Sequence, residues 1–193
     1  MYKLIAHRGD KSFAKENTLA SFFDALKGDY VGFECDVRIT KDKNFIIYHD
    51  AFYKHKLIRN TNYSELNVPL LSTILNIKTD KIILIDIKDS MIDIDNLEKL
   101  FLKYNKDNLY VMCFDEKVIR KLSENKERKY NLGVLNYVIN TNEKHFKYDF
   151  LVIPSIAYNK KIKLLFENDN KKLMIYAIKK ENINNDMPYY IVD

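Results

Sequence analysis

Short apolar runs recur along the whole chain, and segments in which polar residues dominate separate them. The runs are rich in Ile, Val, Leu and Tyr, and each has the length of a β-strand. Several are almost continuously apolar, which is typical of parallel strands that are covered on both faces. The predicted strands lie at residues 3–6, 30–37, 44–49, 81–88, 109–114, 130–136, 149–154, 172–178 and 189–193.

Most segments between these strands have helical periodicity. Residues 16–28 and 96–105 place apolar side chains at i, i+3 and i+4, and Asn17 or Thr18 is expected to cap the first of these helices. The connection RITKDK at 38–43 is different, because it is too short for a parallel crossover and suits a hairpin. The strand at 44–49 is therefore expected to be antiparallel and the other eight parallel.

Eight parallel strands that alternate with helices are typical of a (β/α)8 barrel. We expect a compact TIM-type barrel formed by residues 1–193 as a single domain, with an extra hairpin strand after the second barrel strand. A doubly wound open sheet is the alternative that the same pattern allows. The 193 residues, 47% of them hydrophobic, suffice for one core and call for no second domain.

The composition indicates in which compartment the protein lies and which kinds of partner it has. No apolar run has the length of a secretory signal or a membrane span, so we expect a soluble, cytoplasmic protein without stable membrane insertion. Cys35 and Cys113 have no metal-finger spacing and are interpreted as packing residues. The net charge of +5 is spread among 27 acidic residues, which favours a solvated surface over a nucleic-acid partner.

Polar residues gather at the carboxyl ends of the predicted strands, where the active sites of barrels lie. Side chains alternate along a strand, so Glu34 and Asp36 share a face from which Cys35 points away. Each group alone also fits a solvated strand end, but their convergence favours a site. His55 and His145 lie in polar surroundings and are expected at the surface. The converging residues are His7, Arg8, Gly9, Glu34, Asp36, His49, Asp50, Asp86 and Lys88.

Three of these residues, Glu34, Asp36 and Asp86, are carboxylates on neighbouring strands. Such a pair repels by about 4 kcal/mol at about 4 Å with an effective dielectric near 20. The trio is therefore expected to surround a cation. Ligands that are all oxygens indicate a hard ion, one Mg²⁺ or Ca²⁺, and not zinc.

The remaining groups suit a phosphate. Arg8 and Lys88 supply hydrogen-bond donors for an anion, and an arginine fork and a hard metal both bind phosphate. His7 and His49 can act as acid and base near neutral pH. A metal, an anion clamp and an acid/base pair together predict cleavage of a phosphodiester.

The sequence resembles the glycerophosphodiester phosphodiesterase family, because its motifs occur in the order of that family and near the family's spacing. The specific part of the match covers residues 5–50, with HRG at 7–9, ENTLASFFDAL at 16–26, FECDVRITKD at 33–42 and HD at 49–50. Weaker matches follow, with VPLLSTILN at 68–76, DIK at 86–88, CFD at 113–115, IYAIKKEN at 175–182 and YYIVD at 189–193.

The resemblance implies a TIM-type barrel that hydrolyses small-molecule glycerophosphodiesters to glycerol 3-phosphate and an alcohol. Gly9 is expected to let the backbone turn so that its two neighbours face the barrel mouth. The implied roles are metal ligation by Glu34, Asp36 and Asp86, acid/base catalysis by His7 and His49, phosphate binding by Arg8 and Lys88, and support from Glu16 and Asn17.

Several positions depart from the family pattern. Asp86 stands where the pattern has Glu, although the related sphingomyelinase D branch also has Asp there, followed by the same Lys. Cys113, Tyr176 and Lys179 replace Ser, Trp and Asn on the glycerol side. Two alternatives therefore stay open: a phospholipase D-like cleavage that gives a cyclic phosphate, and a non-catalytic module that binds a phosphorylated ligand.

Overall fold

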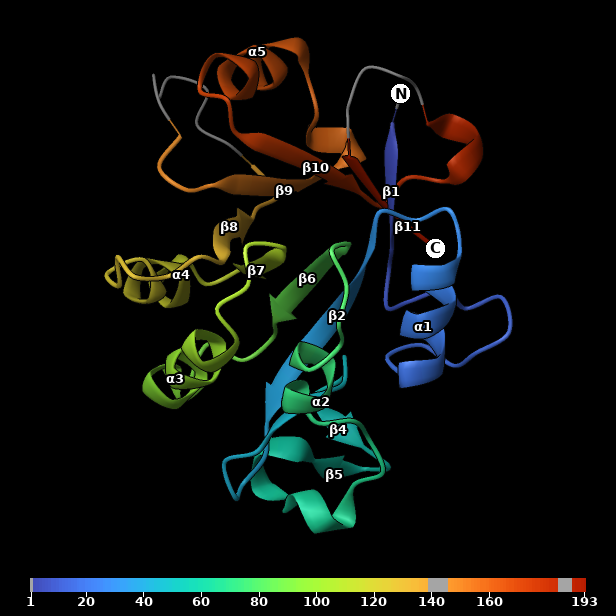
Figure 1. Ribbon diagram of the computed structural model, residues 1–193, viewed down its shortest axis with the longest axis vertical. Helices are drawn as coiled ribbons and strands as arrows, with labels where there is room; N and C mark the ends of the chain where they lie inside the picture. Colours follow the sequence, from blue (N-terminus) through green and yellow to red (C-terminus); the bar gives the residue numbers. More distant parts are fainter. Residues whose placement is uncertain (1, 139–145, 184–188) are drawn as a thin grey trace.

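The computed structural model, which describes residues 2–138, 146–183 and 189–193, is built around a closed β-barrel (Figure 1). Strand β1 pairs with both β2 and β11, and this double pairing closes the ring. The prediction of a (β/α)8 barrel is confirmed, and the open sheet is wrong. The barrel strands, all parallel, are β1 (Lys3–Ala6), β2 (Gly32–Ile39), β6 (Ile82–Ile87), β7 (Leu109–Cys113), β8 (Asn131–Leu135), β9 (Phe150–Pro154), β10 (Lys172–Tyr176) and β11 (Tyr189–Val192).

A ninth strand lies outside the ring. β3 (Phe45–Ile47) pairs antiparallel with the end of β2, with Val37 opposite Ile47, so the predicted hairpin is confirmed. The next segment forms elements that the apolar pattern does not predict, because strands of two residues carry no periodicity. These elements are β4 (Phe52–Tyr53), β5 (Lys56–Leu57) and the 3-10 helices η1 (Ile58–Asn60) and η2 (Tyr63–Glu65).

The helices lie around the outside of the barrel (Figure 1). Asp93 caps α3 through the amide of Asn96, and Asp115 caps α4 through the amide of Lys117, so sequence-local hydrogen bonds set where both helices begin. The α-helices are α1 (Leu19–Lys27), α2 (Leu71–Leu75), α3 (Ile94–Tyr104), α4 (Glu116–Leu122) and α5 (Lys160–Asn168), with 3-10 turns η3 (Ser155–Ala157) and η4 (Lys180–Asn182).

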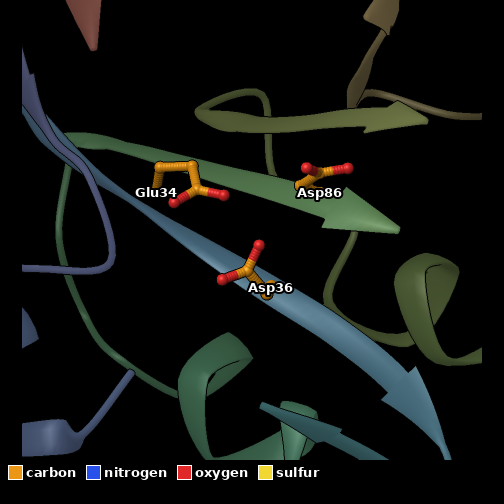
Figure 2. Close-up of side chains that lie close together, drawn as sticks. All are labelled: Glu34, Asp36 and Asp86. Carbon is orange, nitrogen blue, oxygen red and sulfur yellow. The ribbon is translucent and has the colours of Figure 1, made fainter. Parts of the chain in front are cut away.

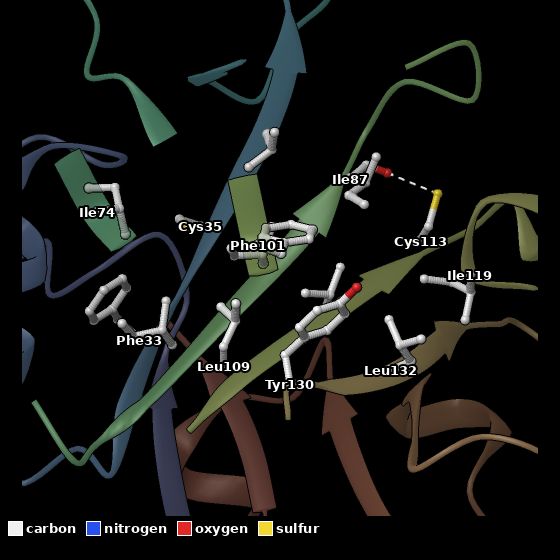
Figure 3. Packing of buried hydrophobic residues seen from close by; sticks show 14 of the residues in the cluster. Phe33, Cys35, Ile74, Ile87, Phe101, Leu109, Cys113, Ile119, Tyr130 and Leu132 are labelled. Carbon is white, nitrogen blue, oxygen red and sulfur yellow. Dashed lines mark hydrogen bonds between the residues drawn. The ribbon is translucent and has the colours of Figure 1, made fainter. Parts of the chain in front are cut away.

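Buried apolar side chains form two layers, one inside the barrel and one between the strands and the helices. Figure 3 shows the outer layer, in which Cys35 and Ile87 from the strands share a cluster with Phe101 from α3. Each such side chain contributes roughly 1.5–3 kcal/mol by its burial. Because side chains alternate, the polar neighbours of these strand residues point into the barrel. Cys35 and Cys113 are buried free thiols, so their interpretation as packing residues is confirmed.

The helices of the described residues are short. The longest, α3, has 11 residues. Among the parts of the chain that the structure describes, none is a helix with the length and hydropathy needed to cross a bilayer.

Candidate active site

Three buried carboxylates converge inside the barrel at the carboxyl end of its strands. Glu34 and Asp36 lie on β2, and Asp36 is paired in register with Asp86 on β6. Their exposed fractions are 2%, 0% and 3%. Each offers a carboxylate oxygen, and these oxygens lie within 4.8 Å of one another. Figure 2 shows the three side chains gathered between β2 and β6, as alternation along the strands predicts.

The carboxylates strongly perturb one another. Burial, together with the charges of Asp36 and Asp86, raises the pKa of Glu34 well above its usual value. Burial also raises the pKa of Asp86. Burial acts in the same direction on Asp36, but Lys88, the Asn17 amide and Arg8 outweigh it, so the pKa of Asp36 is lowered. Without a further cation, this cluster is therefore short of positive charge.

The donor set fits a hard divalent cation. All three ligand groups are carboxylates, and the spread of their oxygens allows one ion to contact all of them. Within the described part of the chain, Oδ1 of Asp86 is buried with neither a hydrogen bond nor an ion pair, and Oδ1 of Asp36 is buried with only an ion pair to Lys88. Buried carboxylate oxygens are costly to leave without a partner. A cation bound by the trio would supply that partner.

Two side chains with permanent positive charge flank the trio. Lys88 Nζ donates to Asp86 Oδ2 over 2.5 Å and lies 3.1 Å from Asp36 Oδ1. Burial alone would lower the pKa of Lys88, but Asp86 and Asp36 raise it above its usual value. Arg8 Nε lies 3.1 Å from Asp36 Oδ2 without the geometry of a hydrogen bond, and its Nη1 donates to both oxygens of Glu16. The side chains of Lys88 and Arg8 therefore both stay positively charged beside the carboxylates.

The backbone after β1 is bent to bring Arg8 to the site. Arg8 and Gly9 have φ angles of 59° and 85°, and the amide of Arg8 donates to Glu34 Oε2 over 3.1 Å. A Cβ at Gly9 would lie 2.4 Å from Ser21 Oγ, so only glycine fits. The sharp turn expected at Gly9 is present.

Asn17 belongs to the site and does not cap α1. It is buried with φ of 55°, its Nδ2 donates to Asp36 Oδ2 over 2.8 Å, and its Oδ1 accepts from the Asp36 amide. Thr18 is the N-cap, exchanging hydrogen bonds with Ser21 in a capping box. Of the two caps that the sequence allowed, the structure therefore selects Thr18.

The two histidines lie at the carboxyl ends of β1 and β3, and each has a carboxylate beside its Nδ1. His7 Nδ1 lies 2.7 Å from Asp193 Oδ1, and His49 Nδ1 lies 2.8 Å from Asp50 Oδ1. Burial lowers the pKa of His7 below its usual value, and the hydrogen bond to Asp193 only partly offsets this. His7 is therefore largely neutral at pH 7.

Hollows adjoin this end of the barrel. One, of about 370 Å³, is lined by His7, Tyr176, Lys179 and Asp193, so two of the positions that depart from the family pattern lie beside His7. Cys113, the remaining replacement on the glycerol side, is buried, its Sγ donates to the carbonyl of Ile87, and burial raises its pKa to about 12. It is therefore a packing thiol and not a nucleophile.

Sequence reasoning did not assign roles to several residues that touch the site. Asp193 and Lys11 form an ion pair beside His7. Arg38 Nε donates to the carbonyl of His49 over 2.8 Å, and its Nη1 donates to Asp89. Adjacency of the first and last strands, which a closed barrel requires, was the signal that could have found Asp193.

The other two histidines of the chain are predicted to lie at the surface. His55 is exposed, as expected. His145 lies outside the described residues.

Known proteins resemble this chain in sequence and in fold. The uncharacterized protein YqiK of Bacillus subtilis is 30% identical over 126 residues, which cover 53% of this chain and 52% of that protein, so the chain spans about half the length of this curated relative. A glycerophosphodiester phosphodiesterase structure from Agrobacterium tumefaciens superposes with a TM-score of 0.81 at 17% identity, covering 100% of this chain and 96% of that one.

A phosphodiesterase structure from Oleispira antarctica, in complex with the product sn-glycerol-3-phosphate, superposes with a TM-score of 0.77 at 18% identity and covers 98% of this chain and 92% of that one. At such identities these structures establish the fold. The family model described as "Glycerophosphoryl diester phosphodiesterase family" matches residues 7–184, from the first site histidine to beyond β10. The chain therefore belongs to the glycerophosphoryl diester phosphodiesterase family.

Proposed function

We propose that this protein hydrolyses glycerophosphodiesters to glycerol 3-phosphate and an alcohol, with one divalent cation, Mg²⁺ or Ca²⁺, held by Glu34, Asp36 and Asp86. The observation that carries the proposal is the buried trio itself, whose ligand oxygens lie within 4.8 Å of one another beside two fixed cations. The printed name of the family and the product bound to the Oleispira protein support the substrate class.

When bound, the cation would polarise the phosphate and stabilise the charge that develops on its oxygens. Arg8 and Lys88 lie on the same trio, so a phosphate seated there meets two permanent donors. Asn17 holds Asp36 by two hydrogen bonds and keeps that carboxylate oriented. Glu16 accepts both contacts from one Arg8 nitrogen and fixes the guanidinium.

The histidines would move the protons. In each, Nδ1 is engaged by an aspartate, so Nε2 is the nitrogen available to the substrate. One histidine would take the proton from the nucleophile and the other would give a proton to the leaving alcohol. His7 and His49 follow different strands, which suits action on two sides of one phosphate.

The test is a panel of glycerophosphodiesters incubated with the protein and Mg²⁺ or Ca²⁺, with products identified by phosphorus NMR. We expect glycerol 3-phosphate from at least one member and none from the His7→Ala or His49→Ala variant. The matched control is Asp107→Asn, an exposed site before β7 at the opposite end of the barrel, which should retain the parent rate. No turnover of any diester by the metal-loaded parent would contradict the proposal and favour a binding module.

A second candidate reaction uses the same residues. Asp86 and Lys88 are paired over 2.5 Å in a D-x-K arrangement, the feature that suggests cleavage by a hydroxyl of the substrate itself. The phosphorus spectrum separates the two reactions, since that route releases a cyclic phosphate. Water enriched in heavy oxygen would label glycerol 3-phosphate directly only in the hydrolytic reaction.

A further inference from the structure

Closure of the barrel places Asp193 beside His7. The two residues directly follow β11 and β1, where Val192 is paired in register with Ala6. The amide of His7 donates to the carbonyl of Val192 over 2.8 Å, which extends the pairing by one step. The contact between the two side chains is therefore set by the strand register and not by a loop.

The side chains of this pair are within hydrogen-bond distance. His7 Nδ1 and Asp193 Oδ1 are 2.7 Å apart. Burial would raise the pKa of Asp193, but hydrogen bonds from Lys11 and His7 lower it below its usual value, so Asp193 is an ionised acceptor at pH 7. An acceptor at this position requires the hydrogen of neutral His7 to be on Nδ1, which leaves the Nε2 lone pair free.

We propose that Asp193 is a positioning residue that holds the ring of His7 in one orientation and in the tautomer protonated on Nδ1. Its catalytic consequence rests on the proposed function. Asp193 does not touch the reacting atoms and acts through the histidine. His49 has a separate partner, Asp50, at 2.8 Å, so the two histidines are positioned independently.

Charged and titratable groups of both signs face His7, so removing one or the other should shift its pKa in opposite directions. Arg8 and Lys11 face it from the loop after β1, Asp193 faces it from the end of the chain segment that follows β11, and Tyr176 and Lys179 line the same hollow. Lys11 binds the oxygen of Asp193 that His7 uses. Removal of Asp193 should therefore destabilise the imidazolium of His7, whereas removal of Lys11 should stabilise it.

The first experiment follows the ring nitrogens of His7 by nitrogen NMR in the substrate-free protein. In the parent we expect the hydrogen on Nδ1. Asp193→Asn should mix the tautomers and lower the pKa of His7, and Lys11→Ala should raise that pKa. Asp50→Asn should alter only the His49 signals, and Asp107→Asn neither set. An unchanged tautomer of His7 in Asp193→Asn would overturn the proposal.

The second experiment measures turnover of a glycerophosphodiester. Asp193→Asn should lower kcat about 10- to 100-fold with little change in KM. This loss is smaller than the roughly 10²–10⁴-fold rate enhancement that a positioned acid or base contributes, because the histidine itself remains. Asp193→Glu, which retains a carboxylate, should keep more activity than Asp193→Asn. Parent kcat in Asp193→Asn, while His7→Ala is inactive, would overturn the positioning role.

The two experiments separate the positioning role from the proposed function. If the parent hydrolyses no glycerophosphodiester, the proposed function fails. The NMR titration then decides on its own whether Asp193 fixes the tautomer of His7. Thermal unfolding of each variant, compared with that of Asp107→Asn, identifies any loss of rate that comes from unfolding.

Discussion

Among single residues, Asp86 is the proposed metal ligand at which this chain departs from the expected family pattern, which has Glu. Its carboxylate reaches about one methylene less far than that of Glu, and Ca²⁺ accepts longer and more variable ligand distances, about 2.3–2.6 Å, than Mg²⁺ at about 2.0–2.1 Å. We expect Asp86→Glu to stay active and to change the preference between the two ions.

Asp86→Ala should weaken metal binding by about 100-fold or more, since groups that only support a ligand already cost about 10–100-fold when removed. Titration calorimetry with each ion, for the parent and both variants, measures these affinities. If Asp86→Ala keeps the affinity of the parent, Asp86 is not a ligand and the trio reduces to Glu34 and Asp36.

Glu34 makes the stability of the metal-free protein depend on pH. Its pKa in the folded protein lies well above the usual 4.5, so the folded state holds a proton that the unfolded state has released. Stability of the metal-free protein should therefore fall as the pH rises above about 4.5 through the raised pKa of Glu34. A bound divalent cation should remove much of this loss.

Urea unfolding in the presence of a chelator, followed across pH, measures this effect. Glu34→Gln should flatten the dependence, and Glu127→Gln, a change at an exposed glutamate, should leave it as in the parent. Parallel curves for the parent and Glu34→Gln would show that Glu34 is not the group that titrates.

Among the secondary-structure elements, the start of α1 has two neighbouring residues with different roles: Asn17 contacts the site and Thr18 caps the helix. Asn17→Gly keeps a backbone that tolerates φ of 55° but removes both hydrogen bonds to Asp36, so we expect metal affinity to fall about 10- to 100-fold. Thr18→Ala removes the cap and the hydrogen bond from Thr18 Oγ1 to the Lys15 carbonyl but no contact with Asp36, so it should cost about 1 kcal/mol of stability while metal affinity is retained. Metal titration and thermal unfolding of both variants test this division. Equal metal affinities in the two variants would contradict it.

The turn after β1 gives a second element-scale prediction. Gly9→Ala must place a Cβ 2.4 Å from Ser21 Oγ at φ of 85°, so we expect the free energy of unfolding to fall by roughly 1–3 kcal/mol. Activity should also fall, because Arg8 would move. Gly28→Ala is the matched control, since Gly28 has φ of −82° and its added Cβ would lie 3.4 Å from the nearest atom. Chemical unfolding and the turnover rate are the measurements. Equal stability of the two variants would show that the turn at Gly9 can relax.

At the scale of the whole molecule, the elements that the sequence predicts well are those with a regular pattern. Alternation on β2 correctly predicted that Glu34 and Asp36 share one face and that Cys35 points away from it, into what the structure shows to be the outer layer. What alternation could not give is pairing between distant segments. The register of Asp36 with Asp86 and the contact of His7 with Asp193 depend on how the strands tilt and close, and no local pattern encodes this.

Pairing of neighbouring strands also explains why a residue without an assigned role lies near the site. Arg38 was part of a recognised motif, but its contacts with the His49 carbonyl and with Asp89 join β2, β3 and the loop after β6. The contact with Asp89 spans 51 residues of sequence and the contact with the His49 carbonyl spans 11, and both form only when the strands are assembled. Local motifs therefore identified most of the groups at the site, and the fold identified their partners.

If the buried trio holds a divalent cation on which catalysis depends, turnover of a glycerophosphodiester should respond to chelation of the protein and to Mg²⁺ or Ca²⁺ titrated back afterwards. We expect no turnover in the chelator and a saturable return of the rate with at least one of the two ions. Glu34→Gln and Asp36→Asn should fail to recover at the same ion concentrations, whereas Asp107→Asn should recover as the parent does. Full turnover by the parent in excess chelator would show that catalysis needs no bound cation.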